Sequence, residues 1–143
     1  MIEEYYATDG KLAYQNVRCP EINVFRYKEE LRPYMINLEK QTLYGYPWNK
    51  MYDLTYLKKI HLKFTEYHTN EFIEDIAFNI AYCTDTDSLT ILPVTPYHYA
   101  KRLKDSLTNE FVPEYYLMHK RRISLLLEQH RYWAIVTPKG KKY

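Results

Sequence analysis

The sequence predicts an α+β fold in which helices pack on a small antiparallel sheet. Two β-prone runs, residues 4–7 and 12–14, flank an Asp9-Gly10 turn and predict a hairpin. Apolar residues recur at the spacing of one helix face over residues 29–43, 54–67 and 114–129. Runs at 77–83 and 89–93 predict a second hairpin. A length of 143 residues predicts one domain, spanning residues 1–143.

The remaining elements follow from local signals along the chain. Gly45-Tyr46-Pro47 is expected to end the helix over residues 29–43. Residues 71–78 are expected to form a short helix or an approach segment, and residues 96–107 a further helix. A last strand is expected over residues 132–137. No linker, repeat or low-complexity stretch interrupts this order.

Composition places the chain among soluble globular proteins, with 46% hydrophobic and 27% charged residues. Two cysteines, Cys19 and Cys83, make no disulfide scaffold and favour a reduced, intracellular protein. The acidic amino terminus lacks a signal-peptide pattern, so secretion is not expected. The longest apolar runs are far too short to span a membrane. No zinc-binding or phosphate-loop motif is present.

The charge is mildly basic overall and unevenly distributed. A net charge of +2 is lower than a stand-alone DNA-binding protein usually carries. Basic residues gather in the last third of the chain, where they either contact phosphates in a salt-sensitive way or form solvated helix faces. The 17 tyrosines suit interfaces and stacking on bases, or simply replace Phe and Leu in an AT-rich genome.

The most informative stretch is Cys83-Thr84-Asp85-Thr86-Asp87-Ser88-Leu89. Two carboxylates one residue apart, at a tight turn between strands, project in the same direction. Mg²⁺ prefers oxygen ligands of this kind, and enzymes that act on nucleotide phosphates use them. The alternative interpretation is an Asp/Thr/Ser turn that only caps a hairpin.

Asp85-Thr86-Asp87-Ser88 resembles the third catalytic motif of family B DNA polymerases. The version here is most similar to the protein-primed branch found in phages, viruses and linear plasmids. The resemblance implies a polymerase-palm-like sheet and a DNA-directed DNA polymerase. It also implies that Asp85 and Asp87 are catalytic and hold Mg²⁺ or Mn²⁺.

Gln41-Thr42-Leu43-Tyr44-Gly45 resembles the end of the second motif of the same family, so residues 30–45 resemble the end of its fingers helix. The resemblance implies that Tyr44 lies by the incoming nucleotide. Asn37 stands where the family has a phosphate-binding Lys, and Lys40 lies on roughly the same helix face. Asn37 or Lys40 would then face the phosphates. An ordinary amphipathic helix closed by glycine is the alternative.

His130-Arg131-Tyr132 resembles the family motif that contacts the primer end from the palm, with His130 in place of a Lys. The resemblance implies that His130, Arg131 and Tyr132 bind DNA. The alternative is a strand that begins with a solvated basic pair.

The resemblance covers roughly residues 30–143, and it implies a partial or split polymerase that transfers nucleotides to a primer 3′-hydroxyl. Primer–template DNA and nucleotides are its implied partners, with no membrane. The first family motif, which supplies another metal-binding Asp, is not found before residue 37. Either the amino-terminal strands substitute for it, or another polypeptide supplies it.

Two other functions remain open on the sequence. In the first, the chain is a catalytically inactive, repurposed binding or structural module of viral or plasmid origin. In the second, the motif matches are coincidental, and the chain is a small viral protein that binds a host factor. Metal binding at Asp85 and Asp87 separates the polymerase hypothesis from both.

Overall fold

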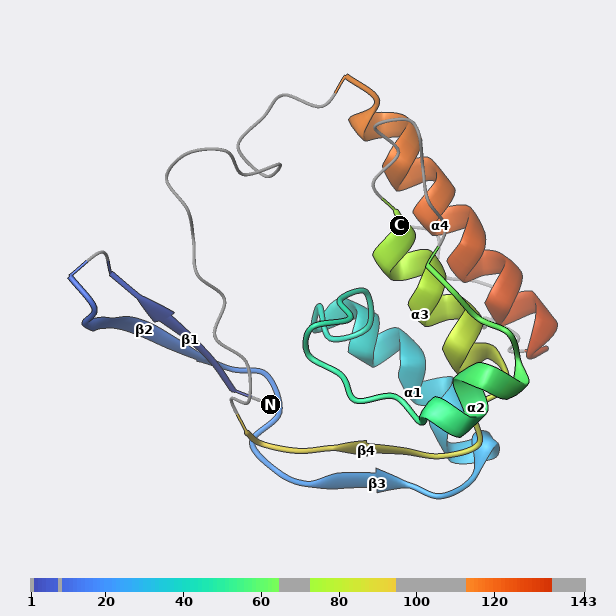
Figure 1. The fold of residues 1–143 in the computed structure, drawn as a ribbon, viewed down its shortest axis with the longest axis horizontal. Coiled ribbons are helices and arrows are strands. Elements are labelled where there is room, and N and C mark those ends of the chain that lie inside the picture. Colours follow the sequence, from blue (N-terminus) through green and yellow to red (C-terminus); the bar gives the residue numbers. More distant parts are fainter. Residues whose placement is uncertain (1, 8, 65–72, 95–112, 135–143) are drawn as a thin grey trace, which may run out of the picture.

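The predicted α+β class is confirmed by the computed structural model, which describes residues 2–7, 9–64, 73–94 and 113–134. Helices and strands alternate irregularly along these ranges (Figure 1). Their order is β1 (Ile2–Tyr6), β2 (Leu12–Val17), β3 (Asn23–Phe25), α1 (Lys28–Lys40), α2 (Leu54–Lys59), α3 (Glu74–Thr84), β4 (Leu89–Ile91) and α4 (Tyr115–Tyr132).

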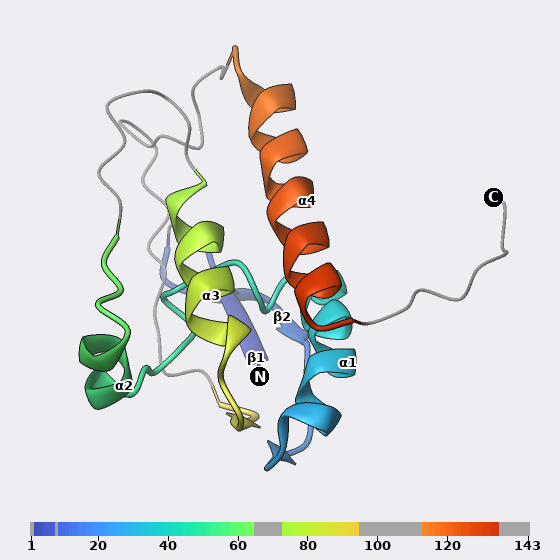
Figure 2. The same cartoon turned by 90° about the vertical axis from the view of Figure 1, so that its right-hand side faces the viewer.

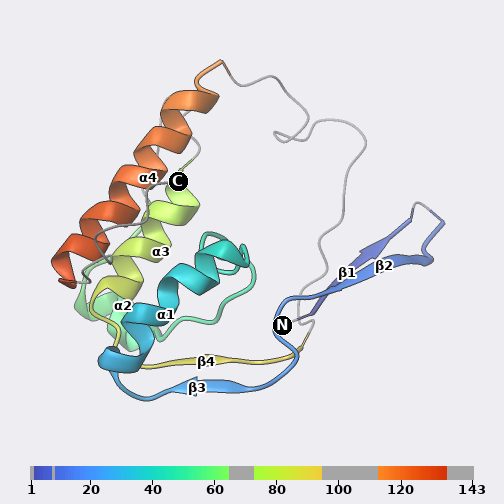
Figure 3. The ribbon, with the colours of Figure 1, turned by 180° about the vertical axis from the view of Figure 1, so that it is seen from behind.

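The predicted amino-terminal hairpin is confirmed, with strands longer than the sequence indicated. β1 and β2 pair antiparallel around the Asp9-Gly10 turn. Gly10 has a φ of 80°, a conformation that glycine adopts without steric cost. The Lys11 amide donates a hydrogen bond to Asp9 Oδ1 at 3.0 Å, which fixes the turn. The hairpin stands apart from the helices (Figures 1 and 3).

A second two-stranded sheet joins β3 to β4, two segments far apart in the sequence. The strands are antiparallel, with Asn23 opposite Ile91. Ile91 is buried on the inner face, whereas Val24 is exposed on the outer face. Phe25 contacts Tyr34 of α1, with ring centroids 4.7 Å apart. This contact places α1 over the inner face of the sheet.

The predicted hairpin of residues 77–83 and 89–93 is wrong, because residues 77–83 belong to α3. Ile76, Asn79, Ile80 and Cys83 are buried at the i, i+3, i+4 and i+7 spacing of one helix face. A short apolar run can form either a strand or a helix. Here the buried residues follow the helical period, and the segment forms a helix. The short helix suggested for residues 71–78 is part of α3 from Glu74 onward, and residues 71–72 lie outside the described ranges.

α1 confirms the predicted helix over residues 29–43, but it ends well before Gly45-Tyr46-Pro47. The Thr42 amide donates to the Glu39 carbonyl at 3.0 Å, and the Leu43 amide donates to the Leu38 carbonyl at 2.8 Å. These two bonds form a Schellman motif, which closes the last turn. Thr42 holds a φ of 59°, the left-handed conformation that this motif requires.

α2 is shorter than the helix predicted over residues 54–67. Asp53 caps its start by accepting hydrogen bonds from the Thr55 and Tyr56 amides. The helix ends at Lys59, and His61 then takes a φ of 52°. Residues 65–67 of the predicted helix lie outside the described ranges.

α4 confirms the helix predicted over residues 114–129 and continues to Tyr132. The predicted strand therefore does not begin at Tyr132. Residues 133–134 form a turn after α4, so the strand is wrong there as well. Residues 135–137 of that strand and the helix predicted over residues 96–107 lie outside the described ranges. α3 and α4 lie side by side (Figures 1 and 2). Their shared face and α1 enclose the hydrophobic core.

One buried polar residue, Asn79, links α3 to the loop that follows α1. Asn79 is fully buried. Its amide nitrogen donates to the carbonyls of Gly45 at 3.0 Å and Asp75 at 2.8 Å, and its oxygen accepts from the Tyr52 hydroxyl at 2.7 Å. A buried amide is tolerated when its donors and acceptor are satisfied, as they are here.

Replacing Asn79 by Ala leaves the Gly45 carbonyl and the Tyr52 hydroxyl without this partner and opens a cavity. We expect the free energy of unfolding to fall by about 2–3 kcal/mol, because unsatisfied buried polar groups carry their full desolvation cost. Urea denaturation measures this loss, and the dependence of the unfolding free energy on urea concentration should be the same in both proteins. Asn37→Ala on the exposed side of α1 is the control and should cost little. An equal loss in both variants would contradict this role of Asn79.

Candidate functional site

The two motif carboxylates lie in the turn between α3 and β4. Asp85 is the C-cap residue directly after α3, and Asp87 follows two positions later. Both side chains are exposed. The Thr86 hydroxyl donates to the Tyr82 carbonyl at 2.8 Å, so the turn continues the last helical turn. The carboxylates therefore lie at a helix-to-strand turn, and the expectation that they lie at the tip of a β-hairpin is wrong.

The end of α4 lies against this turn. The Tyr132 hydroxyl donates to Asp85 Oδ1 at 3.2 Å. His130, Arg131 and Tyr132 occupy the last turn of α4, whereas the sequence placed them at the start of a strand. Two motifs separated by 47 residues thus meet in space. Arg131 is exposed, and His130 Nδ1 lies 2.7 Å from the Leu126 carbonyl oxygen.

A buried amide, Gln129, joins the end of α4 to the segments around Tyr44 and Thr84. Gln129 Oε1 accepts a hydrogen bond from the Tyr44 hydroxyl at 2.9 Å. Gln129 Nε2 donates to the Ile80 carbonyl at 3.0 Å and to Thr84 Oγ1 at 3.1 Å. The residue is 4% exposed, and its bonds to Tyr44 and Ile80 are shielded from water, whereas the bond to Thr84 is partly buried. The segments around Tyr44, Thr84 and Gln129 are consequently held together by one side chain.

Trp133 adds a second link between α4 and the carboxylate turn. Its indole nitrogen donates to the Thr84 carbonyl at 2.8 Å, and the ring is buried. The guanidinium carbon of Arg32 lies 5.7 Å from the centre of this ring, in a cation–π arrangement. The end of α4 is therefore fixed directly beside the residues that precede Asp85.

The structure places Tyr44 in the core. The residue is 1% exposed, and its hydroxyl is bonded to Gln129. Burial raises the pKa of the Tyr44 hydroxyl well above its ordinary value. Asn37 and Lys40 lie exposed on α1. In the described ranges, no hydrogen bond or ion pair links either of them to Asp85 or Asp87.

The sequence interpretation missed Gln129, and it gave Thr84 and Trp133 no role in positioning the site. One signal was available for Gln129, since it falls on the same helix stripe as Leu125, Leu126 and Trp133. A polar residue on an otherwise apolar stripe indicates a buried hydrogen-bonding role. The partner 85 residues away could not be identified from spacing.

A largely buried lysine lies in the loop that follows Tyr44. Lys50 Nζ donates to the carbonyls of Leu43 and Tyr46 at 2.7 and 2.6 Å, and to Asn49 Oδ1 at 2.8 Å. Burial lowers the pKa of Lys50 to about 8, while the nearby Cys83, Asp75 and Glu39 act in the opposite direction. The loop is thus closed around a cation.

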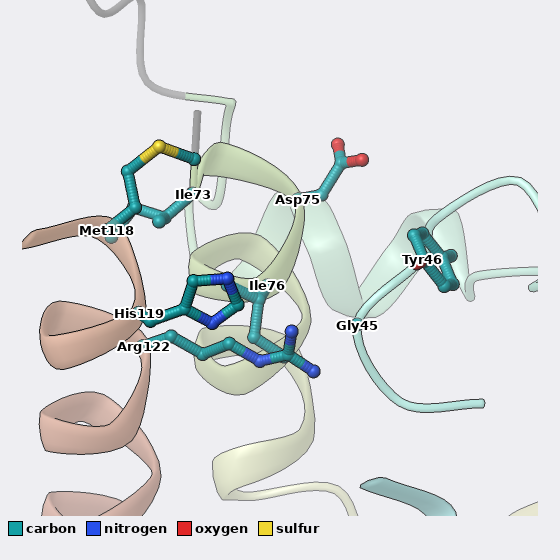
Figure 4. Close-up of a pocket in the computed structure, with 8 residues that line it drawn as sticks. All are labelled: Gly45, Tyr46, Ile73, Asp75, Ile76, Met118, His119 and Arg122. Carbon is teal, nitrogen blue, oxygen red and sulfur yellow. The ribbon is translucent and has the colours of Figure 1, made fainter. Parts of the chain in front are cut away.

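A hollow of about 190 Å³ lies between α3, α4 and the Gly45-Tyr46 segment. His119 and Arg122 reach from α4 toward α3 and Gly45, whereas the Asp75 carboxylate points away from them (Figure 4). Arg122 is ion-paired with Glu39 of α1. Arg122 is therefore turned toward the interior of the protein, and its charge is already compensated.

The left-handed conformation of Thr42 carries a steric cost, because a β-branched side chain fits it poorly. We expect Thr42→Gly to raise the free energy of unfolding by about 0.5–1 kcal/mol. Thr55→Gly, within the ordinary helical turn of α2, is the matched control and should lower it by roughly 0.3 kcal/mol. Thermal or urea unfolding measures both changes. A loss in both variants would show that the Thr42 conformation is not strained.

Lys50 should make stability depend on pH. Its pKa is about 8 in the folded protein and 10.5 in the unfolded chain, so the unfolded chain binds more protons between these values. The free energy of unfolding should therefore rise with pH across this window. Burial raises the pKa of the Cys83 thiol to about 12, which works in the opposite direction above pH 9.

Comparison with Lys50→Met isolates the lysine contribution. The difference in unfolding free energy between the wild type and Lys50→Met should rise by about 2 kcal/mol between pH 7.5 and 10. Urea denaturation at several pH values provides the measurement. Lys59→Met removes a charge from an exposed position and is the control. A pH-independent difference for Lys50→Met would contradict the assignment.

Within the described ranges, no three His, Cys, Asp or Glu side chains gather into a group that could hold a metal ion. None of the helices in those ranges combines the length and apolar character needed to cross a membrane.

Comparison with protein-family models, curated proteins and solved structures finds no match to this chain.

Proposed function

We propose that the chain is a palm-like part of a DNA polymerase similar to family B enzymes, acting in nucleotidyl transfer to a primer 3′-hydroxyl. The observation that carries the proposal is the meeting of the three motif segments. Tyr132 contacts Asp85, and Gln129 contacts both Tyr44 and Thr84. These segments are separated by 40 residues or more in the sequence, yet they lie together in the fold. If the motif matches were coincidental, nothing would favour this proximity.

Asp85 and Asp87 are the side chains that would hold a divalent cation. Both are exposed and offer carboxylate oxygens, which suit Mg²⁺ or Mn²⁺. A bound cation would neutralise charge on the transferring phosphate. Two-metal phosphoryl transfer uses several carboxylates, so the proposal includes a further ligand from another polypeptide.

Arg131 and Tyr132 would contact the primer strand. Arg131 is exposed on the last turn of α4, and Tyr132 is 66% exposed while its hydroxyl contacts Asp85. A primer end bound at this turn would therefore lie beside the cation ligands. Such placement is the main contribution that a protein makes to phosphoryl transfer.

A second function, a binding module that has lost catalysis, is favoured by the state of Tyr44. The hydroxyl that the resemblance places by a nucleotide is buried and bonded to Gln129. One oxygen of Asp85 likewise accepts from Tyr132. In this second function the motif residues stabilise the fold, and the exposed surface binds a partner.

Titration with Mn²⁺, followed by electron paramagnetic resonance, tests the polymerase proposal. We expect binding in the wild type and at least tenfold weaker binding in Asp87→Asn, because the variant removes one anionic ligand. Asp9→Asn is the control, since Asn also accepts the hydrogen bond from the Lys11 amide and the hairpin turn that holds it stands apart from the helices. Wild-type binding equal to that of Asp87→Asn, or none at millimolar Mn²⁺, would favour the inactive module.

A further inference from the structure

The outer face of α4 is formed by Tyr116, Lys120, Ile123, Leu127 and Arg131. All five side chains are exposed, and they follow one another at the i+3 and i+4 spacing of a single helix stripe. Tyr116 is 74% exposed. The opposite side of the helix packs on α3 through buried residues such as Gln129 and Trp133. In all three ribbon views α4 lies at the edge of the described part of the chain (Figures 1, 2 and 3).

The charge on this side of α4 is predominantly positive. Lys120 and Arg131 are exposed on the stripe, and Glu128 is an exposed carboxylate beside it. Arg122 does not contribute, because it is ion-paired with Glu39 on the inner side. Lys120 and Arg131 are separated by eleven residues, which corresponds to about 16 Å along a helix. The stripe is therefore a linear basic track that attracts an extended polyanion.

An aromatic ring lies at the start of the same track. Tyr116 is near the first turn of α4, and its side chain is exposed. Exposed tyrosine rings offer flat apolar surfaces on which nucleic-acid bases stack. In a duplex the faces of the bases are hidden against one another. Stacking on Tyr116 therefore requires an unpaired strand.

We propose that the outer face of α4 binds single-stranded nucleic acid, with Lys120 and Arg131 at phosphates and Tyr116 stacked on a base. The site rests on the proposed function and deepens it, because Arg131 is also the residue proposed to contact the primer strand. It does not depend on a cation at Asp85 and Asp87. The strand would run along the helix toward the carboxylate turn.

Fluorescence anisotropy with a labelled twenty-nucleotide oligo(dT), measured over a range of KCl concentrations, tests the phosphate contacts. Each phosphate contact contributes about −0.7 to the slope of log K against log salt for single strands. The double variant Lys120→Gln/Arg131→Gln should therefore make the slope less negative by about 1.4. Lys59→Gln on α2 is the control and should leave binding unchanged.

Stacking is tested separately at Tyr116. Tyr116→Ala should weaken oligo(dT) binding on the order of tenfold, whereas Tyr116→Phe should retain it, because the ring rather than the hydroxyl stacks. Tyr27→Ala removes another exposed ring and is the matched control. A twenty-base-pair duplex should bind more weakly than oligo(dT) and should not respond to Tyr116→Ala. Circular dichroism verifies that each variant is folded.

The outcomes separate this site from the polymerase proposal. Oligo(dT) binding that the α4 variants weaken would support the site even if Mn²⁺ does not bind at Asp85 and Asp87. Mn²⁺ binding without oligo(dT) binding, or with α4 variants that bind normally, would overturn it and leave the proposed cation site intact. Equal binding of duplex and single strand would overturn it as well. Loss of self-association in the α4 variants, without any oligo(dT) binding, would assign the face to a second copy of the chain.

Discussion

The amide of Gln129 is the contact on which the arrangement of this protein depends. It uses its acceptor for Tyr44 and its donors for Ile80 and Thr84, and its own side chain is buried. A buried amide that lost one of these partners would carry an uncompensated desolvation cost. α4, α3 and the segment after α1 are therefore positioned together, and the carboxylate turn and the end of α4 follow from that placement.

Local signals predicted the parts of the fold that local physics controls. Asp9-Gly10 predicted the hairpin because few residues other than glycine adopt a positive φ, and the periodic apolar positions predicted α1 and α4. The pairing of β3 with β4 joins segments more than 60 residues apart, and no local pattern specifies it. Ala77–Cys83 was predicted as a strand because it is a short, mostly apolar run that precedes a turn. The helical spacing of its apolar residues indicated a helix, but the prediction of a hairpin was preferred.

The candidate site was predictable in its residues more than in its geometry. Asp85, Asp87, Arg131 and Tyr132 were selected from motifs, and the structure brings Tyr132 to Asp85. Their metal-binding and DNA-binding roles stay predictions. Tyr44 was also selected from a motif, but it lies in the core, where its hydroxyl donates a hydrogen bond to Gln129. Such pairings depend on the packing of whole helices, which a motif does not encode.

The isolated β1–β2 hairpin has a consequence for the behaviour of the protein at high concentration. In the described ranges it belongs to a sheet of two strands, so both outer edges present backbone groups that can pair with another chain. Glu4 lies in β1, and a charge on an edge strand opposes fibrillar stacking. Acidic solution neutralises carboxylates and removes that repulsion. Preparations of this protein are therefore best concentrated at neutral pH, where the edge remains charged.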